Sequence, residues 1–499
     1  MNFKNLRENY VNYVGDISEL GDFVEGAAKV WSDRVAFIHN EREKTYRQFR
    51  DDVVSLENIL SGRGIKKGDK IALVCENSYE WVISYFAVIG VGGIIVPVDV
   101  EIPIPKIAKL LEENNIGKVI CSPKYSGISD ILDAEAFWTD ELYLSVENNS
   151  GVPVFVKNFE YDPDDICQIS FTSGTTGKMK AVMLNSRNII SDSIGASKII
   201  NAETEARLLL ILPMNHMFTI TASIIIPIMR GAKIYISSGK KYFLREFIAF
   251  KPDWLVIVPA IVKSVFKVAA SAMSTGNNPD MMAVISNLKC IVCGGAPLDT
   301  KYIGIFKQFG INLVNGYGIT ECSPVVSVNY PDANIPGSCG ITVDGCTIRI
   351  NAPDEDGCGE IYVRGENVFC GYADETDNVG VFDDGWFRTG DIGRLDENGA
   401  LFITGRKKNL IIMDNGKNVS SEELEEFIMN EVPEVEEIIV KGVDGIIDAV
   451  IYTSEGNPDK IKSDIMALNR ELPSYKQIKR IEFREEPFEK TTSMKIIRV

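Results

Sequence analysis

Apolar and polar positions in the first part of the chain alternate between strand-like and helix-like spacing. Short apolar runs bounded by polar residues predict buried strands, and longer runs with apolar residues three or four apart predict helices. Thr45 and Gln48 form a capping box, which marks a helix start. Strands separated by helices pair in parallel through right-handed crossovers. The predicted strands are Arg34–His39, Lys70–Val74 and Gly93–Val98, and the predicted helices run from Thr45 to near Gly62 and Gly64 and over Tyr79–Ile89.

The same alternation of strands and helices recurs further along the chain and is then replaced by other sequence patterns. It repeats from Ile166 to Ile236 and from Trp254 to Asn315. From Gly337 to Gly405, short strands and many Gly, Asp and Asn turn signals predict a small β-rich subdomain.

After Gly405 a charged segment, GRKKN, precedes a compact C-terminal pattern. Ser420 and Glu423 cap a helix there, and we expect strands at Glu436–Val440 and Asp448–Tyr452 and a helix at Ser463–Glu471. The predicted fold class is α/β, with a large N-terminal domain of parallel-type α/β subdomains, a small β-rich subdomain and a small α+β C-terminal domain. The predicted boundaries are 1–405 for the N-terminal domain, 406–409 for a hinge and 410–499 for the C-terminal domain.

Charge excludes two classes of function as main roles. The chain has 499 residues and a formal net charge of −18 at pH 7. Such an acidic chain repels the phosphates of nucleic acid and of anionic lipid, although a local basic cleft for a small anion is still possible. No stretch approaches the roughly 18 apolar residues that suggest a membrane span, and the polar start MNFKNLRENY lacks a signal-peptide core.

The ten cysteines are scattered through apolar stretches. Cys290 and Cys293 form a lone C-x-x-C in a strand-like run, and a zinc site would need a second pair or histidines. The chain has only His39 and His216, so we expect the cysteines to be free core residues. Free thiols and the absence of an export signal predict a cytoplasmic protein.

The segment Ser170–Asn188 carries the strongest chemical signal. Its run TSGTTGK follows the strand-like stretch DICQISF and precedes a helix-like segment. Small residues let a backbone approach phosphate closely, and Lys178 and Lys180 add positive charge. The spacing G-x-x-G-K is not that of the Walker P-loop. A flexible surface loop is the alternative interpretation.

This segment resembles the phosphate loop of the adenylate-forming superfamily, the AMP-binding enzymes that include acyl-CoA synthetases, stand-alone acyl or aryl adenylating enzymes and luciferases. Further motifs follow in the family's order and cover nearly the whole chain. The resemblance implies that the loop binds ATP, through Thr172, Ser173, Gly174, Thr175, Thr176, Gly177, Lys178 and Lys180. Met179, Ala181, Ser186 and Met494 depart from the family pattern, but none of these departures removes a charge that the chemistry needs.

Two more segments resemble the family's nucleotide site. In NGYGITE, the resemblance implies that Tyr317 stacks on adenine, Thr320 contacts the α-phosphate and Glu321 holds Mg²⁺; an aromatic face and a hard carboxylate suit these roles. In DGWFRTGD, the resemblance implies that Asp391 binds both ribose hydroxyls. Without the surrounding motifs, Asp391 would be interpreted as a turn residue. The stretch matched to the adenine edge is Gly294, Gly295, Ala296 and Pro297.

The last motifs concern domain movement and catalysis. The resemblance implies that Arg406 contacts ribose or phosphate, Lys408 is the hinge of a mobile C-terminal domain, and Gly416 lines the tunnel for a thiol. EKTTSMKIIRV places Lys495 where the family has the lysine that drives adenylation. A mobile ammonium there offsets the repulsion between a carboxylate and an α-phosphate; a solvated surface lysine is the alternative.

LPMNHMF matches the edge of the family's acyl pocket, with His216 as gate; a core histidine is the alternative. The stretch lacks the acid that would pair with an α-ammonium group, so an amino acid substrate is disfavoured. The expected pocket is apolar and consists of His216, Met217, Phe218, Gly294, Gly316 and Gly318.

The sequence therefore predicts an ATP-dependent acid–thiol ligase that uses ATP, Mg²⁺ and CoA. It would activate a hydrophobic carboxylic acid, with a fatty acid favoured over an aryl acid, and pass it to CoA. Its catalytic residues would be Lys495, Thr320, Glu321 and His216. One alternative acceptor is the phosphopantetheine of an acyl carrier protein, and a second alternative is a non-catalytic nucleotide-binding homologue.

Overall fold

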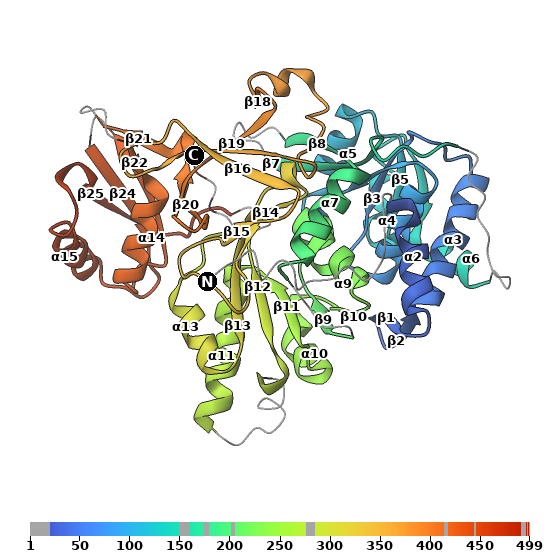
Figure 1. Cartoon of the computed structure of the whole chain (residues 1–499), viewed down its shortest axis with the longest axis horizontal. Helices are drawn as coiled ribbons and strands as arrows, with labels where there is room; N and C mark the ends of the chain where they lie inside the picture. The colour runs from blue at the N-terminus through green and yellow to red at the C-terminus, as the bar shows by residue number, and fades with distance from the viewer. Residues whose placement is uncertain are drawn as a thin grey trace.

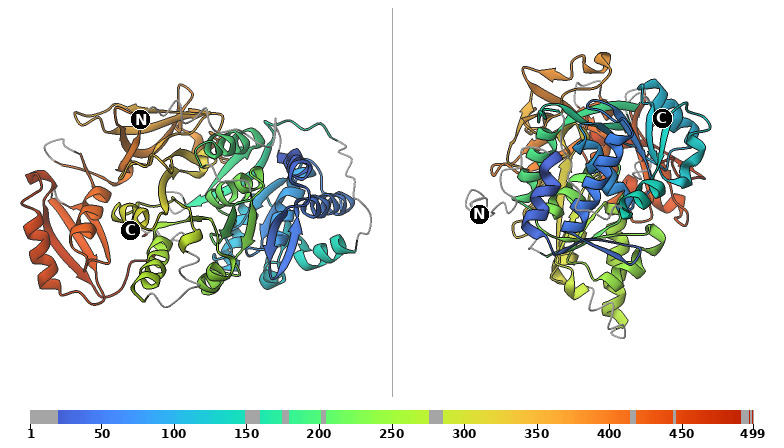
Figure 2. Two further views of the ribbon diagram at one scale, coloured as in Figure 1. Left: turned by 60° about the horizontal axis from the view of Figure 1, so that its bottom comes forward. Right: turned by 90° about the vertical axis from the view of Figure 1, so that its right-hand side faces the viewer.

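The computed structural model describes residues 20–148, 159–173, 179–200, 205–275, 285–413, 418–443, 446–490, 496 and 498. Two large sheets flanked by helices form the N-terminal part, a β-rich layer lies beside them, and the C-terminal residues form a lobe at one end (Figures 1 and 2). The predicted α/β class is confirmed. No helix within the described ranges is long and apolar enough to cross a membrane.

The first sheet has six strands in the order β6-β5-β3-β4-β7-β8. All its neighbours pair in parallel except β7 and β8, which are antiparallel. The predicted capping box opens α3, since the side chains and backbones of Thr45 and Gln48 bond reciprocally. The elements are β3 (Lys70–Val74), β4 (Ile94–Pro97), β5 (Lys118–Cys121), β6 (Glu135–Trp138), β7 (Ile166–Ser173) and β8 (Met179–Asn185), with α2 (Leu20–Trp31), α3 (Tyr46–Gly62), α4 (Tyr79–Gly90), α5 (Ile104–Glu113) and α6 (Thr139–Glu147).

The second sheet has nine strands in the order β15-β14-β13-β12-β11-β9-β10-β1-β2. Its first strand in the sequence, β1, pairs in parallel with β10 far along the chain and antiparallel with β2, so it does not join the sheet of β3 and β4. The elements are β1 (Val35–His39), β2 (Arg42–Thr45), β9 (Arg207–Leu210), β10 (Lys233–Ile236), β11 (Trp254–Ile257), β12 (Cys290–Cys293), β13 (Asn312–Gly318), β14 (Val325–Val328) and β15 (Ile341–Thr342), with α7 (Ser186–Ser197), α10 (Phe243–Phe250), α11 (Pro259–Thr275) and α13 (Lys301–Gln308).

The β-rich subdomain predicted between Gly337 and Gly405 is present as a five-stranded antiparallel sheet. Its longest strand, β19, pairs with β17, β18 and β20 and so lies at its centre. The strands are β16 (Cys346–Asn351), β17 (Gly359–Gly365), β18 (Phe382–Asp383), β19 (Trp386–Leu395) and β20 (Leu401–Arg406).

The C-terminal lobe has its own hydrophobic core, formed by buried residues from Ile411 to Ile478. Its elements are β21 (Leu410–Ile412), β22 (Asn418–Ser420), α14 (Ser421–Glu431), β23 (Glu437–Val443), β24 (Ile446–Tyr452), α15 (Pro458–Leu468) and β25 (Ile478–Arg484). Ser420 caps α14 as predicted, accepting a bond from the Glu423 amide. The second predicted helix is misplaced, because Asn457 caps α15 and Pro458 begins it, five residues before Ser463. The exact domain boundaries stay a prediction.

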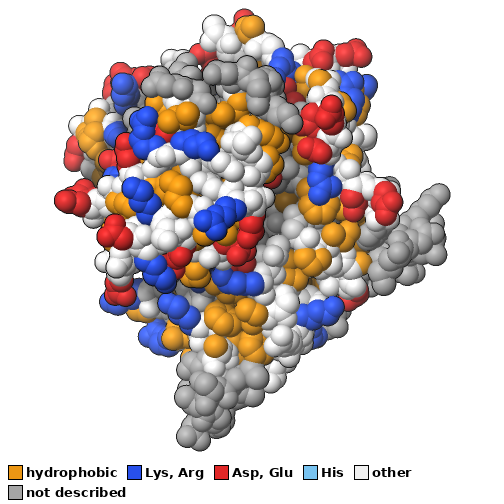
Figure 3. Space-filling model, turned by 90° about the vertical axis from the view of Figure 1, so that its left-hand side faces the viewer, with side chains coloured by type: hydrophobic (Ala, Val, Ile, Leu, Met, Phe, Trp, Pro, Cys, Tyr) orange, Lys and Arg blue, Asp and Glu red, His pale blue; other side chains and the backbone are white. Residues whose placement is uncertain are grey.

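The described cysteines are free, and most are buried, as the sequence predicted. Burial raises the pKa of both Cys290 and Cys293, so neither thiol is activated. On the face that carries the C-terminal lobe, basic and acidic side chains are interspersed (Figure 3). The excess negative charge is therefore not concentrated on that face.

Candidate active site

The glycine stretch predicted to border adenine lies where β12 and β13 end. These strands are parallel neighbours, with Cys293 opposite Asn315, so Gly294 and Gly316 lie side by side. A β-carbon on Gly294 would lie 3.2 Å from Phe218 Cζ and 3.6 Å from the Gly316 oxygen. Gly295 is exposed and has φ of +83°, which favours glycine. The strand ends thus form a shallow cradle of bare backbone.

Three predicted nucleotide residues meet beside this cradle. The Tyr317 hydroxyl donates to Asp391 Oδ2 at 2.5 Å, and Arg406 Nε lies 2.9 Å from Asp391 Oδ1. Asp391 and Arg406 are direct partners across β19 and β20, which fixes their pairing through the strand register. Asp391 is buried at 3% exposure, whereas the Arg406 side chain is 44% exposed. The arrangement presents a carboxylate, a phenol ring and a guanidinium at one place.

Electrostatics in this cluster favour the charged form of Arg406 and the neutral form of Tyr317. The charge of Asp391 is the main cause that raises the pKa of Arg406. Burial, followed by the charge of Asp391, raises the pKa of Tyr317 far above its usual value. The phenol therefore stays protonated and donates its hydrogen bond.

Glu321 lies on a short 3₁₀ turn, η4 (Thr320–Cys322), directly after β13. Its carboxylate accepts a hydrogen bond of 2.7 Å from the Tyr372 hydroxyl. Burial raises the pKa of Glu321, and the bond from Tyr372 opposes that rise. Sequence reasoning missed Tyr372, because no spacing in GYADETD distinguishes it from an ordinary turn tyrosine.

The predicted phosphate loop connects β7 and β8, and only its edges are described. Thr172 pairs with Lys180 across this hairpin, and Ser173 pairs with Met179. Gly174, Thr175, Thr176, Gly177 and Lys178 lie outside the described residues. The expectation of a helix-like segment after the loop was wrong. Met179–Asn185 is a strand because antiparallel pairing with β7 supplies its backbone bonds, and α7 begins only after Asn185 caps it.

The predicted acyl gate begins a helix that contains a π-helical turn. His216 precedes α8 (Met217–Thr219), and η2 (Ile220–Ile225) and α9 (Ile226–Met229) continue it. Pro227, which lacks a backbone N–H, lies in the first turn of α9, directly after the π turn. His216 is half-buried, whereas Met217 is buried, with its Sδ accepting a bond of 2.8 Å from Gln168 Nε2. Of the predicted pocket residues, Phe218 and Gly316 lie next to Gly294, while Met217 belongs to the core. Gly318 packs against the Pro324 backbone.

The predicted hinge forms a short 3₁₀ turn, η6 (Lys407–Asn409). Lys408 is exposed there, and partial burial together with the charges of Arg406 and Arg498 lowers its pKa. Gly416 and Lys495 lie outside the described residues. Near Lys495, Lys490 pairs with Ile496, and Arg498 bonds to Glu425 on α14 and, at 3.0 Å, to Ser421 Oγ.

The residues present fit a magnesium–nucleotide complex by their chemistry. Mg²⁺ is usually held by one or two carboxylates together with water and substrate phosphates, so Glu321 with the Thr320 hydroxyl is an adequate donor set. Among the described residues, no three His, Cys, Asp or Glu side chains form a preformed metal cluster. A metal at Glu321 would therefore depend on water and phosphate oxygens for most of its ligands.

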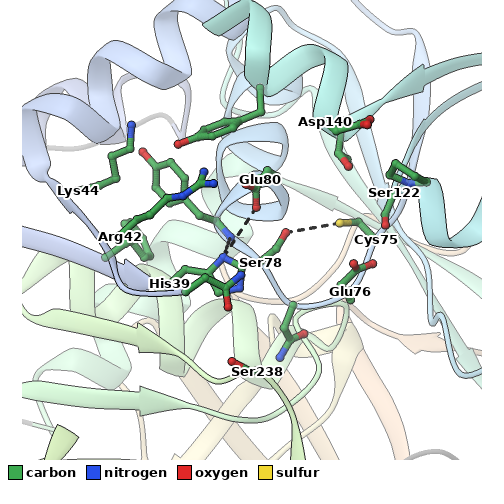
Figure 4. Close-up of a pocket in the computed structure, with 17 residues that line it drawn as sticks. His39, Arg42, Lys44, Cys75, Glu76, Ser78, Glu80, Ser122, Asp140 and Ser238 are labelled. Carbon is green, nitrogen blue, oxygen red and sulfur yellow. Dashed lines mark hydrogen bonds and ion pairs between the residues drawn. The ribbon is translucent and has the colours of Figure 1, made fainter. Parts of the chain in front are cut away.

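One cavity of about 390 Å³ lies apart from this site, where β3, β5 and β6 end (Figure 4). It is lined by charged residues of both signs, including Arg42, Lys44 and Glu76, and by none of the predicted acyl-pocket residues. One of its lining residues, Asn77, lies next to the predicted gate segment, since its side-chain amide bonds to the backbone of Leu212 and Met214 at 2.8 and 2.9 Å. The cavity is therefore not the predicted acyl pocket.

Comparison with known proteins agrees with this arrangement. The family described as AMP-binding enzyme matches residues 24–373, more than half of the chain. The long-chain-fatty-acid–CoA ligase FadD13 of Mycobacterium tuberculosis is 29% identical over 470 residues, covering 88% of this chain and 89% of the relative. The 2-succinylbenzoate–CoA ligase of Bacillus pumilus is 28% identical over 443 residues and covers 84% of each chain.

The fold is also that of solved members. The O-succinylbenzoate coenzyme A synthetase of Bacillus subtilis, in complex with ATP and magnesium ion, superposes with a TM-score of 0.80 at 22% identity, covering 95% of this chain and 98% of that one. The chain belongs to the AMP-binding enzyme family, within the adenylate-forming superfamily. Its curated relatives include both acyl-CoA and aryl-CoA ligases.

Proposed function

We propose that this protein is an AMP-forming acid–thiol ligase that activates a hydrophobic carboxylic acid with ATP and transfers the acyl group to CoA. The observation that carries the proposal is the convergence of Tyr317, Asp391 and Arg406 beside the glycine cradle. A ring, a buried carboxylate and a guanidinium match a purine, a diol and a phosphate respectively. Arg406 places one positive group at this site, in a chain of net charge −18.

The chain's own groups divide the first half-reaction between them. Asp391 accepts the ribose hydroxyls, and Arg406 and Lys180 offset the charge of the phosphates. Lys495 stands between the attacking carboxylate and the α-phosphate, where its ammonium stabilises the charge that develops. Thr320 donates to the α-phosphate. When bound at Glu321, Mg²⁺ shields the phosphate oxygens from the incoming anion.

The acceptor half-reaction needs the C-terminal domain to turn about Lys408. That rotation withdraws Lys495 and brings the loop that carries Gly416 to the tunnel for the thiol. The separate hydrophobic core after Ile411 supports movement of residues 410–499 as one unit. His216 gates the acyl pocket.

The acid is proposed to be apolar, with a fatty acid favoured and an aryl acid possible. The gate segment Leu212–Phe218 contains no carboxylate that could pair with an ammonium group, and burying an unpaired ammonium costs several kcal/mol. Relatives named for long-chain fatty acids and for succinylbenzoate support this range. The protein is proposed to act in the cytoplasm.

Exchange of labelled pyrophosphate into ATP, measured with a panel of acids, tests the proposal. We expect exchange with medium- to long-chain fatty acids above that with aryl acids, and none with free amino acids. No exchange with any acid, despite ATP binding, would favour the non-catalytic homologue. In the second half-reaction, CoA should accept the acyl group better than a holo acyl carrier protein; the reverse order would favour the carrier-loading alternative.

A further inference from the structure

The segment Phe369–Ala373 connects two predicted parts of the site. On one side the segment pairs with β8, since Cys370 N donates to the Met183 oxygen at 3.0 Å and Ala373 N donates to the Ala181 oxygen at 2.9 Å. Tyr372 lies opposite Val182 in this pairing. The segment is therefore fixed to the strand that carries Lys180, at the end of the phosphate loop.

On its other side the same segment holds Glu321 twice. Phe369 N donates to the backbone oxygen of Glu321 at 2.9 Å, and the Tyr372 hydroxyl donates to Glu321 Oε1 at 2.7 Å. The rings of Phe369 and Tyr372 pack edge to face with their centroids 4.9 Å apart. Because both donors belong to one short, paired segment, the Glu321 carboxylate has a fixed position relative to β8.

The Tyr372 ring also supports the phosphate-loop lysine. Lys180 Nζ lies 4.5 Å from the ring centroid and 3.4 Å from Asp377 Oδ1. A cation over an aromatic face is attracted by the ring quadrupole, and the contact limits where a flexible lysine can point. One side chain thus contacts both a predicted metal ligand and a predicted phosphate ligand.

We propose that Tyr372 is a positioning residue that orients Glu321 for Mg²⁺ through its hydroxyl and Lys180 for phosphate through its ring. The inference rests on the proposed function, because it gives Tyr372 a role only if Mg²⁺ and ATP bind here. Groups that hydrogen-bond a metal ligand fix its orientation and change metal affinity by about 10- to 100-fold. The two contacts use different parts of the side chain, so they can be removed separately.

The test measures binding rather than turnover. ATP is titrated into the full-length protein by calorimetry, once with excess EDTA and once with excess MgCl₂, and the ratio of the two dissociation constants reports the metal's contribution. Tyr372→Phe removes the hydroxyl and keeps the ring, whereas Tyr372→Leu removes both. Tyr362→Phe is the matched control, since Tyr362 is a buried tyrosine on β17 whose ring contacts Arg349.

We expect Tyr372→Phe to reduce the gain from Mg²⁺ about tenfold and to leave ATP affinity in EDTA unchanged. Tyr372→Leu should also weaken binding in EDTA, by about threefold to fivefold, and Tyr362→Phe should match wild type. Equal loss for Tyr372→Phe in both buffers, or no loss in either, overturns the positioning role alone. Wild-type protein that binds no ATP in either buffer overturns the proposed function and this role with it.

Discussion

Replacing Asp391 with asparagine tests the centre of the proposed nucleotide site with almost no change in shape. In the native protein, Asp391 accepts from the Tyr317 hydroxyl at 2.5 Å and from Arg406 Nε at 2.9 Å. An amide has one acceptor oxygen, so it can keep the bond from Arg406 only by turning its NH₂ group toward the Tyr317 oxygen. Both contacts can survive in that orientation, but neither retains the negative charge.

The expected cost follows from the loss of charge. A hydrogen bond to a charged group contributes about 1.5–3 kcal/mol and a neutral one about 0.5–1.5 kcal/mol, so the Tyr317 contact weakens by about 1 kcal/mol. The Arg406 contact keeps its charged donor and loses the attraction between opposite charges. The half-exposed Arg406 recovers part of this loss from water. A bound ribose loses more, because two hydroxyls that shared a carboxylate meet a single acceptor. We expect ATP or AMP to bind about 10- to 100-fold more weakly.

The assay is calorimetric binding of ATP and of 2′,3′-dideoxy-ATP to wild type and to Asp391→Asn. If Asp391 binds the ribose hydroxyls, removing the hydroxyls and removing the carboxylate should each weaken binding, and the combined loss should be clearly smaller than the sum. Asp396→Asn is the control, since Asp396 accepts backbone bonds in the turn between β19 and β20. Fully additive losses would refute the ribose assignment, even if Asp391→Asn binds weakly.

Three further predictions concern the two half-reactions and the acid. Lys495→Ala should lower pyrophosphate exchange about 10²–10³-fold and spare thioester formation from supplied acyl-adenylate; unchanged exchange would contradict the assignment. Lys408→Pro fixes φ at this position near −65°, so the chain could adopt only one of the two domain orientations and the half-reactions should separate. Adenylation should be retained if the permitted orientation is the one used for adenylation. Equal loss of both half-reactions, or no loss of either, would reject Lys408 as the hinge. His216→Trp should shift the exchange profile toward shorter acids because the larger ring fills acyl space, and an unchanged chain-length profile would remove His216 from the pocket.

Local signals in the sequence predicted local structure well. The capping residues Thr45 and Ser420 act within four residues of their partners, and both bond as predicted. The strand at Lys70–Val74 is found with the same bounds. Partners far apart in the sequence were not predictable, because a run of apolar residues does not encode which sheet it joins. For this reason β1 was assigned to the wrong neighbours, and the strand after the phosphate loop was taken for a helix-like segment.

In the candidate site too, contacts between residues far apart in the sequence were not predictable. Motif order suggested Tyr317, Asp391 and Arg406, and the structure brings them together through the register of β19 with β20 and the hydrogen bond from Tyr317 on β13 to Asp391. No motif indicated Tyr372, because its contact with Glu321 spans 51 positions and depends on a segment that pairs with β8 through an isolated bridge. The proposed roles of all these residues stay predictions until binding is measured.

The chemistry of the contacts around Lys408 bears on whether the predicted hinge can turn. Among the described residues, two side-chain hydrogen bonds join the C-terminal lobe to the segment around Lys408: Asn409 donates to Glu422, and Ser420 donates to the Thr404 oxygen. The buried cluster of the C-terminal lobe starts at Ile411 and does not merge with the core of the N-terminal part. Opening an apolar interface costs about 25 cal/mol for each Å² exposed, whereas polar groups that separate exchange their hydrogen bond for bonds to water, at a net cost of about 0.5–1.5 kcal/mol for each bond. A turn at Lys408 would therefore break polar contacts and leave both hydrophobic cores intact.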